Sequence, residues 1–96
     1  MAEANHTLLI DREEVRVTEW TLAPGDATGH HRHGYDYVIV PLTTGLLRAI
    51  GAGGTTDTAL VPGKPYFRKA GVEHDVLNGG AESFTFLEIE LKDRAG

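Results

Sequence analysis

The sequence predicts an all-β protein, folded as an antiparallel β-barrel of the jelly-roll kind. Apolar side chains recur mainly at every second residue rather than with the longer period of a helix, as they do in β-strands. Glycine or proline interrupts the pattern about every eight to twelve residues, which is typical of the turns in sandwiches and barrels. The sequence shows no amphipathic helix of useful length, no repeat and no low-complexity segment. Short strands closed into one barrel account for all of these observations.

In the first half of the chain, turn residues separate the expected strands. Residues 1–6 are expected to be a flexible tail, followed by a short apolar strand at residues 7–10. A longer strand at residues 15–22 ends at the Ala-Pro-Gly-Asp sequence of residues 23–26, which is a strong turn signal. Residues 35–42 are rich in aromatic and β-branched side chains, so they are expected to form a further strand.

The second half of the chain continues in the same way. A Gly-Ala-Gly-Gly sequence predicts a hairpin between strands at residues 46–50 and 55–61. Pro-Gly-Lys-Pro and Asn-Gly-Gly sequences mark later turns. The remaining strands are expected at residues 66–69, 74–77 and 84–91.

Length and composition indicate one small domain that spans residues 1–96. The chain has no cysteine, which excludes disulfides, thiolate metal sites and a cysteine nucleophile. No basic region precedes a long apolar run, and no segment reaches the ~20 apolar residues of a membrane span, so we expect a soluble cytoplasmic protein that binds no membrane. Fourteen acidic against nine basic residues, without a basic cluster, also argue against nucleic-acid binding.

The stretch that follows Gly25 is rich in histidine. His31 and His33 are two residues apart, so on a strand both imidazoles point to one side, while His30 points to the other. Two neutral imidazoles on one strand can chelate a divalent metal ion. The alternative is that these histidines are solvated in a polar loop, which is what we expect of His6 in the N-terminal tail.

Two spaced motifs strengthen the metal hypothesis. The first has the spacing G-x5-H-x-H-x11-G and consists of Gly25, His31, His33 and Gly45. The second has the spacing G-x5-K-x-G-x2-H-x3-N and consists of Gly63, Lys69, Gly71, His74 and Asn78. As a pair they resemble the two motifs of the cupin superfamily, and the run HRHGYDYVIVPLTTG is most similar to the short cupins associated with beta-alanine degradation.

This resemblance implies a cupin barrel in which histidines distant in sequence meet in one cavity. In such a barrel His31, His33 and His74 would hold a divalent metal ion, which could be Fe, Zn, Ni or Mn. Alternate residues of a small closed barrel point inward, so two strands can present imidazoles to the same space.

The chain departs from the cupin pattern at one metal ligand. The superfamily usually places a glutamate after the second histidine, and that position falls here on Tyr37 or Val38; counting back from the last glycine of the motif selects Val38. If Val38 faces the cavity, Asp36 shares its face, and Tyr35, Tyr37 and Ile39 face outward. Tyr37, Asp36 and also His30 remain candidates for completing the site. The second motif departs as well, with Lys69 in place of a proline that shapes a turn.

Aromatic and basic side chains are candidates for the wall and mouth of the cavity. Trp20, Tyr66 and Phe86 can line it, or can be ordinary core residues. Arg48 and Arg68 can meet an anionic group of a ligand at the mouth, or can be solvated.

Near the C-terminus, the alternation of charged and apolar residues predicts which side chains face outward. Glu88 and Glu90 alternate with apolar neighbours and are expected to face outward. Asn78 precedes two glycines and is expected to serve the turn. Ser83 is the sole serine and has no histidine near it in sequence, so the chain carries no sign of a serine-histidine-aspartate triad.

Three classes of function remain open. By resemblance to three-histidine cupins, the chain can be a metal-dependent oxygenase that acts on a small organic acid. It can instead be a non-catalytic module that binds a small molecule, or a structural barrel with a vestigial site. A barrel this small, with apolar side chains turned outward, is also expected to form a homodimer, as the small cupins that it resembles commonly do.

Overall fold

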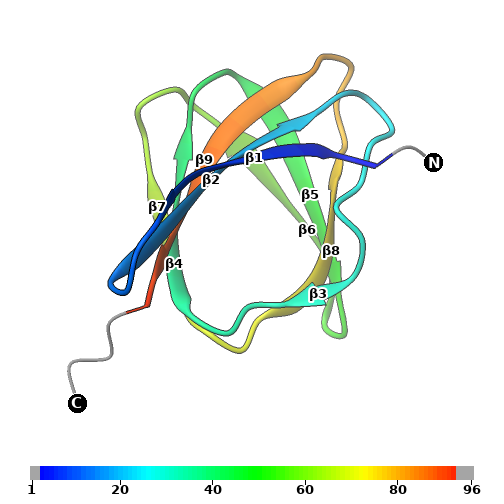
Figure 1. Cartoon of the computed structure of the whole chain (residues 1–96). Coiled ribbons are helices and arrows are strands. Elements are labelled where there is room, and N and C mark those ends of the chain that lie inside the picture. The colour runs from blue at the N-terminus through cyan, green and yellow to red at the C-terminus, as the bar shows by residue number, and fades with distance from the viewer. Residues whose placement is uncertain (1–2, 93–96) are drawn as a thin grey trace.

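The computed structural model describes residues 3–92, which form nine strands arranged in two antiparallel sheets. Figure 1 shows the two sheets curved around a common interior as a barrel. The five-stranded sheet has the order β1-β2-β9-β4-β7, and the four-stranded sheet has the order β3-β8-β5-β6. The strands are β1 (Asn5–Asp11), β2 (Val15–Leu22), β3 (His31–Arg32), β4 (Asp36–Pro41), β5 (Gly45–Gly51), β6 (Gly54–Leu60), β7 (Tyr66–Arg68), β8 (Glu73–Asn78) and β9 (Phe84–Leu91). The predicted all-β antiparallel barrel is confirmed.

The described part of the chain is built of strands, turns and loops. Between residues 3 and 92 no helix is long and apolar enough to cross a membrane. The strands expected at residues 15–22 and 84–91 match β2 and β9, whereas most of the other expected strands differ from the observed ones by a few residues at their ends.

The N-terminal segment is an exception to the expected boundaries. Glu3 forms a bridge with Ala27, and the backbone N–H of Ala4 donates to the Ala27 carbonyl at 3.0 Å. Strand β1 then begins at Asn5. Residues 3–6 therefore lie on the barrel instead of forming the expected tail, because their backbone groups find partners there; residues 1–2 of the expected tail lie outside the described residues.

The register of β4 is the opposite of the one expected from the motif. Tyr37 and Ile39 are buried, with 2% and 4% of their surfaces exposed, whereas Val38 and Val40 lie on the outer face and are half-buried. The expectation that Val38 faces the cavity was therefore wrong. Both faces of β4 are apolar, so alternation alone could not distinguish them; pairing with β9, where Val38 lies opposite Ile89, decides the orientation.

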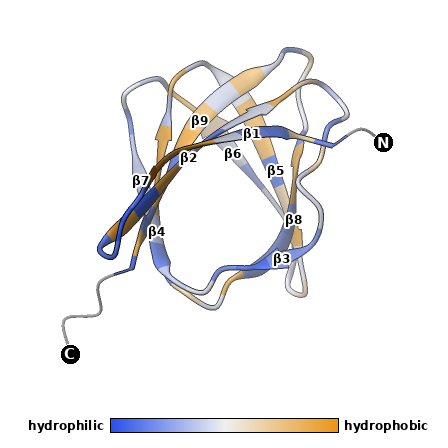
Figure 2. Ribbon diagram, viewed as in Figure 1, coloured by the Kyte–Doolittle hydropathy of each residue, from blue (hydrophilic) through white to orange (hydrophobic). Residues whose placement is uncertain are grey.

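The core fills one end of the barrel, and its packing requires a glycine of the first motif. The side chains of Leu22, Leu60 and Phe84 are almost completely buried. A Cβ atom at Gly45 would lie 2.7 Å from the Cβ of Phe84, so only glycine fits at this position without displacing the core. Figure 2 shows hydrophobic residues along β9 and hydrophilic residues around β3.

An apolar row crosses the outer face of the five-stranded sheet. We call it the outer apolar row; its members are paired side by side across the strands and are Ile10, Val17, Ile89, Val38 and Phe67. The two end members are largely exposed, Ile10 at 45% and Phe67 at 48%. The outer face of this sheet therefore carries a continuous line of apolar side chains.

Candidate metal centre

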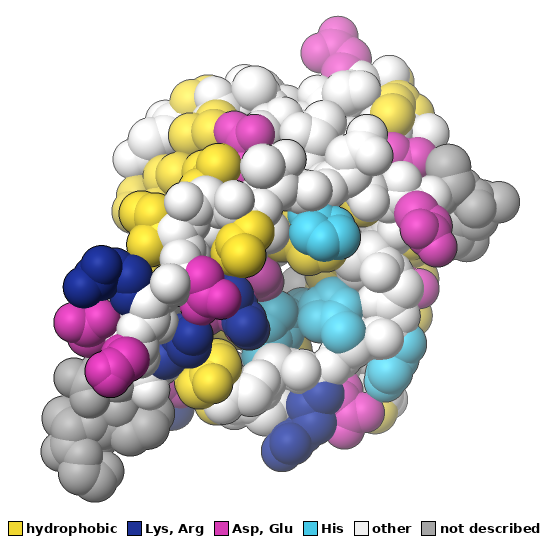
Figure 3. All heavy atoms as spheres, in the orientation of Figure 1, with side chains coloured by type: hydrophobic (Ala, Val, Ile, Leu, Met, Phe, Trp, Pro, Cys, Tyr) yellow, Lys and Arg dark blue, Asp and Glu magenta, His cyan; other side chains and the backbone are white. Residues whose placement is uncertain are grey.

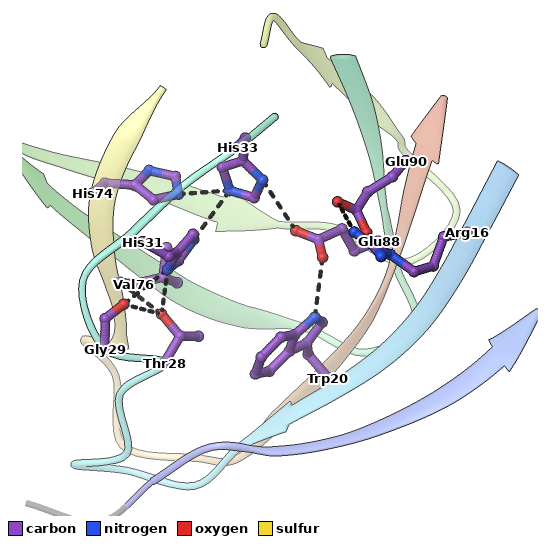
Figure 4. Close-up of polar contacts among 10 residues, drawn as sticks. All are labelled: Arg16, Trp20, Thr28, Gly29, His31, His33, His74, Val76, Glu88 and Glu90. Carbon is purple, nitrogen blue, oxygen red and sulfur yellow. Dashed lines mark hydrogen bonds and ion pairs between the residues drawn. The ribbon is translucent and has the colours of Figure 1, made fainter. Parts of the chain in front are cut away.

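Three histidine side chains meet at the open end of the barrel (Figure 4). The Nε2 atom of His33 lies 3.0 Å from the Nε2 atom of His31 and 3.1 Å from the Nε2 atom of His74. One ring nitrogen from each residue lies within 4.8 Å of the other two. The structure therefore brings together the three histidines that the two motifs single out.

Backbone pairing explains why the rings converge. His31 on β3 lies directly opposite His74 on β8, so the two side chains project from the same face of the sheet. His33 follows two residues after His31, and its backbone still pairs with the loop before β8: His33 N–H donates to the Val72 carbonyl at 2.9 Å, and the His33 carbonyl accepts from Gly71 N–H at 2.8 Å. The extended conformation therefore keeps His33 on the same side as His31, as the spacing predicts.

In His31 and His33, the ring nitrogen that faces away from the cluster, Nδ1, also has a polar neighbour. His31 Nδ1 lies 2.8 Å from the Gly29 carbonyl oxygen, which can only accept, so this nitrogen carries the proton. The Oε2 atom of Glu88 lies 3.7 Å from His33 Nδ1 and favours a proton on that nitrogen too. Both rings are thus held in the tautomer that leaves the Nε2 lone pair free for a metal.

The arrangement fits a divalent metal better than it fits hydrogen bonds among the rings alone. A tetrahedral ion with bonds of ~2.0–2.1 Å holds its ligand nitrogens ~3.3 Å apart, close to the observed separations between the Nε2 atoms. Without an ion, His33 Nε2 would have to carry a proton to reach the Nε2 lone pair of His31, and its unprotonated Nδ1 would then suit Glu88 only if that carboxyl group were protonated. The three imidazoles therefore form a donor set that suits iron, zinc, nickel or manganese.

The environment of two of the rings, His33 and His74, keeps them neutral. Burial lowers the pKa of His33 to about 4, and the neighbouring histidines His31 and His74 contribute in the same direction. Burial likewise lowers the pKa of His74 to about 4, with His31 as the next cause. Only neutral imidazole can ligate a metal, so at neutral pH these two rings are ready to bind one.

Glu88 is a residue of the site that the sequence interpretation placed wrongly. It was expected to face outward, yet its side chain is only 13% exposed and points toward His33 (Figure 4). Its Oε1 atom accepts a hydrogen bond from Trp20 Nε1 at 3.3 Å. Burial raises the pKa of Glu88 to about 7, and the charge of Glu90 adds to that shift.

Glu90 is likewise turned inward, against the expectation from the sequence. It is 8% exposed, and its carboxylate accepts two hydrogen bonds from the guanidinium of Arg16, at 2.6 and 2.9 Å. A signal for both corrections was present on β9: the aromatic residues Phe84 and Phe86 share the parity of the two glutamates, and bulky aromatic side chains usually mark the inner face of a strand.

Of Tyr37 and Val38, the two positions on which the glutamate of the cupin pattern can fall, Tyr37 is the one that faces the histidines. Its ring stacks on the His33 ring with centroids 3.9 Å apart and planes inclined at 22°. Burial raises its pKa, with the nearby charge of Glu88 as the next cause, so the phenol stays protonated at neutral pH. Among Tyr37, Asp36 and His30, Tyr37 is thus the one that lies against the histidine cluster.

His30 and Asp36 are each held by a partner outside the cluster. His30 is not part of the three-histidine cluster and pairs with Glu73, with His30 Nε2 and Glu73 Oε1 3.1 Å apart. The carboxylate of Asp36 accepts a hydrogen bond from Ala70 N–H at 2.8 Å. His6, expected to be a solvated histidine, stacks on Trp20 with ring centroids 4.7 Å apart.

A cavity of ≈ 220 Å³ adjoins the three histidines. Trp20, Tyr66 and Phe86 line it, as the sequence interpretation allowed. Arg68 also lines it, whereas Arg48 does not and instead pairs with Asp57 on the surface. Figure 3 shows histidine side chains at the bottom of a hollow in this face of the molecule.

Solved structures share this architecture. A cupin domain from Bordetella pertussis Tohama I is 47% identical, has a TM-score of 0.91 and is aligned over 96% of each chain. A cupin family protein with a double-stranded β-helix fold from Methanocaldococcus jannaschii is only 12% identical, with a TM-score of 0.79 over 95% of this chain and 82% of that one, and shows the likeness of fold alone. The barrel and its inward-facing histidines define a cupin.

A curated relative narrows the class further. The beta-alanine degradation protein BauB of Pseudomonas aeruginosa PAO1 is 52% identical over 90 residues, which make up 94% of this chain and 95% of that protein. The chain belongs to the cupin family that includes this protein, and the resemblance seen in the motifs is confirmed. No protein-family model matches the chain.

Proposed function

We propose that the chain is a metal-binding cupin that holds one divalent ion, iron, zinc, nickel or manganese, through His31, His33 and His74. The observation that carries the proposal is the convergence of three Nε2 atoms, with the Nδ1 atoms of His31 and His33 engaged on the far side of their rings. Three protein ligands leave at least one coordination position open, and an open position is the mark of a site that acts on a ligand.

We further propose that a small organic acid binds in the cavity beside the ion and is the substrate. The name of the relative BauB, a beta-alanine degradation protein, supports a small acid of this kind. A bound metal would supply Lewis acidity and, in the case of iron, the redox chemistry that an oxygenase needs. Phe86 and Tyr66 line the cavity in which the acid would lie, and Glu88 favours a proton on His33 Nδ1.

A non-catalytic binding module is the second candidate. It is favoured by Tyr37, which replaces an anionic ligand with a neutral ring and so lowers the charge that the protein offers to a cation. Oxygen uptake by iron(II)-loaded protein in the presence of small acids, beta-alanine among them, separates the two candidates. Saturable binding without uptake or product would favour the module.

The metal proposal is tested by elemental analysis and titration of untagged protein. We expect close to one ion per chain at neutral pH for the wild type, and little for His33→Ala or His74→Ala. His30→Ala is the matched control, because His30 is an exposed imidazole outside the cluster. Acidification should release the ion, since protonated imidazole cannot ligate. Failure of the wild type to bind added metal would exclude the proposal and leave a structural barrel.

We also propose that the protein is a homodimer that uses the outer apolar row. Apolar side chains that form one contiguous row on a sheet face are typical of a surface that another chain covers. A two-fold axis through such a face brings the same side chains together from both copies. The side chains differ from those expected from the sequence, because Tyr37 and Ile39 belong to the interior.

A further inference from the structure

We infer that Arg68 binds the carboxylate group of a small monoanionic ligand at the mouth of the cavity, with the rest of the ligand directed toward the three histidines. The inference rests on the proposed function for the orientation of the ligand toward a metal. The assignment of Arg68 itself depends on two observations. Arg68 lines the cavity, and no carboxylate among residues 3–92 pairs with it.

Arg68 lies on the same side of the sheet as the site. On β7 it is paired with Tyr37, whose ring stacks on His33, so the Arg68 side chain starts from the inner face of the five-stranded sheet. It lines the cavity together with His33 and His74. Its guanidinium carbon lies 4.4 Å from the centroid of the Tyr66 ring, and this cation–π contact holds the charged group at the cavity wall.

The guanidinium of Arg68 is free to bind an anion. Three other arginines each pair with a carboxylate: Arg12 with Glu14, Arg16 with Glu90, and Arg48 with Asp57. Among residues 3–92, no carboxylate lies within 4.0 Å of Arg68; the hydrogen bond of its side chain goes to the Phe67 carbonyl, from Nη1 at 3.0 Å. Arg32 also lacks a carboxylate partner there, but it does not line this cavity. A guanidinium has five N–H donors in a planar fork, so most of those of Arg68 remain available to a carboxylate.

The surroundings select a small anion with a single charge. The cavity of ≈ 220 Å³ is smaller than the ~300–1,000 Å³ of sites for drug-sized ligands. Apolar side chains such as Ile39, Val76 and Phe86 form much of its lining. Glu88 lies on the cavity wall beside His33, and when its carboxyl is ionised a doubly charged anion such as phosphate meets repulsion that one arginine offsets only in part.

Trp20 provides a direct signal for binding, because it is the sole tryptophan of the chain and lines the cavity. Titrations followed by its fluorescence and by calorimetry would compare butyrate, the isosteric neutral butyramide and inorganic phosphate. Zinc-loaded and metal-free protein are titrated in parallel, and zinc per chain is measured on the same samples. We expect butyrate to bind wild-type protein about tenfold or more tightly than butyramide, and phosphate to bind weakly.

Two variants test whether Arg68 causes the preference for butyrate over butyramide. Arg68→Gln should weaken butyrate binding about tenfold or more, remove the preference over butyramide, and leave zinc content and Tm unchanged. Arg12→Gln is the matched control, with the same loss of charge at an exposed arginine far from the cavity, and should leave butyrate binding as in the wild type.

The outcomes separate the inference from the metal proposal. Equal binding of butyrate and butyramide, no saturable binding of butyrate, stronger binding of phosphate, or a preference that survives Arg68→Gln would each overturn the inference even if zinc binds. A preference that depends on Arg68 in protein that cannot bind zinc would support the anion site while the metal proposal fails.

Discussion

At the scale of single residues, the main feature is the carboxyl group of Glu88 beside the histidine cluster. The glutamate of the cupin pattern falls in this chain on Tyr37 or Val38, and of these two Tyr37 stacks on His33. A carboxylate enters from β9 instead, as Glu88, and lies against the Nδ1 side of the His33 ring. Burial raises the pKa of this carboxyl group to about 7, and we propose that in its ionised form it orients the His33 ring.

A variant of Glu88 tests this orienting role. Glu88→Gln keeps the shape of the side chain and an oxygen acceptor for Trp20, but removes the negative charge beside His33 Nδ1. We expect zinc affinity to fall about 10- to 100-fold, measured by competition with a chromogenic chelator. Glu14→Gln, at an exposed position, is the control. Unchanged zinc affinity in Glu88→Gln would show that the carboxylate does not act through the ring.

A second variant tests which position corresponds to the missing glutamate. Tyr37→Glu places a carboxylate on the inner face beside His33, whereas Val38→Glu places one on the outer face. We expect Tyr37→Glu to tighten manganese binding; a tenfold gain adds about 1.4 kcal/mol and raises the metal-induced shift in Tm by roughly 5–10 °C. Val38→Glu should show no such gain.

Thermal unfolding with and without manganese provides the measurement, and each variant is compared with its own metal-free form. Since Tyr37→Glu also removes a buried ring, its metal-free form should be less stable than the wild type. A larger metal-induced shift in Val38→Glu than in Tyr37→Glu would contradict the register of β4.

At the scale of elements, the second motif holds the end of β8 in place. Asn78 is 4% exposed, and its side-chain amide donates to the carbonyls of Leu22 at 2.9 Å and Glu82 at 2.8 Å. Its Oδ1 atom accepts from Gly80 N–H at 2.8 Å. The expected role of Asn78 in the turn is confirmed, and the side chain also ties the end of β8 to the end of β2.

Removal of these hydrogen bonds should destabilise the barrel. In Asn78→Ala the buried Leu22 carbonyl loses its side-chain donor, and we expect the free energy of unfolding to fall by about 2 kcal/mol or more. Urea unfolding measures this as a lower midpoint with an unchanged slope. Glu82→Ala is the control, since its backbone carbonyl remains. A midpoint in Asn78→Ala as high as in the control would mean that water replaces the amide.

At the scale of the whole molecule, the two faces of the five-stranded sheet have different tasks. The inner face of β4 and β9 supplies Tyr37, Glu88 and Glu90 to the site, whereas the outer face presents the outer apolar row. A row of apolar side chains facing water costs free energy that a second copy of the chain would recover.

The proposed dimer is tested by charging the exposed ends of this row. Light scattering should give twice the chain mass of 10.4 kDa for the wild type at micromolar concentration, and the single chain mass for a variant with both Ile10→Glu and Phe67→Glu. Ile50→Glu, an exposed position in the other sheet at 42% exposure, should remain dimeric. A monomeric wild type, or a dimer that tolerates both charges, would rule out this interface.

The sequence by itself determined the class of fold, the order of the strands along the chain and the three histidines. Those features depend on local signals: alternation of apolar side chains, turn residues, and a two-residue spacing that keeps His31 and His33 on one side of a strand. The position of His74 came from the spacing of the second motif, and strand pairing with His31 explains it.

Only the tertiary structure decided which face of a strand points inward. On β4 both faces are apolar, and on β9 the apolar residues Leu87 and Ile89 lie outside while Glu88 lies inside, so burial reverses what polarity alone predicts. Orientation is set by pairing with neighbouring strands and by partners such as Trp20 and Arg16, which come from distant parts of the chain. A buried carboxylate is stable only with such partners, and they do not exist until the barrel closes.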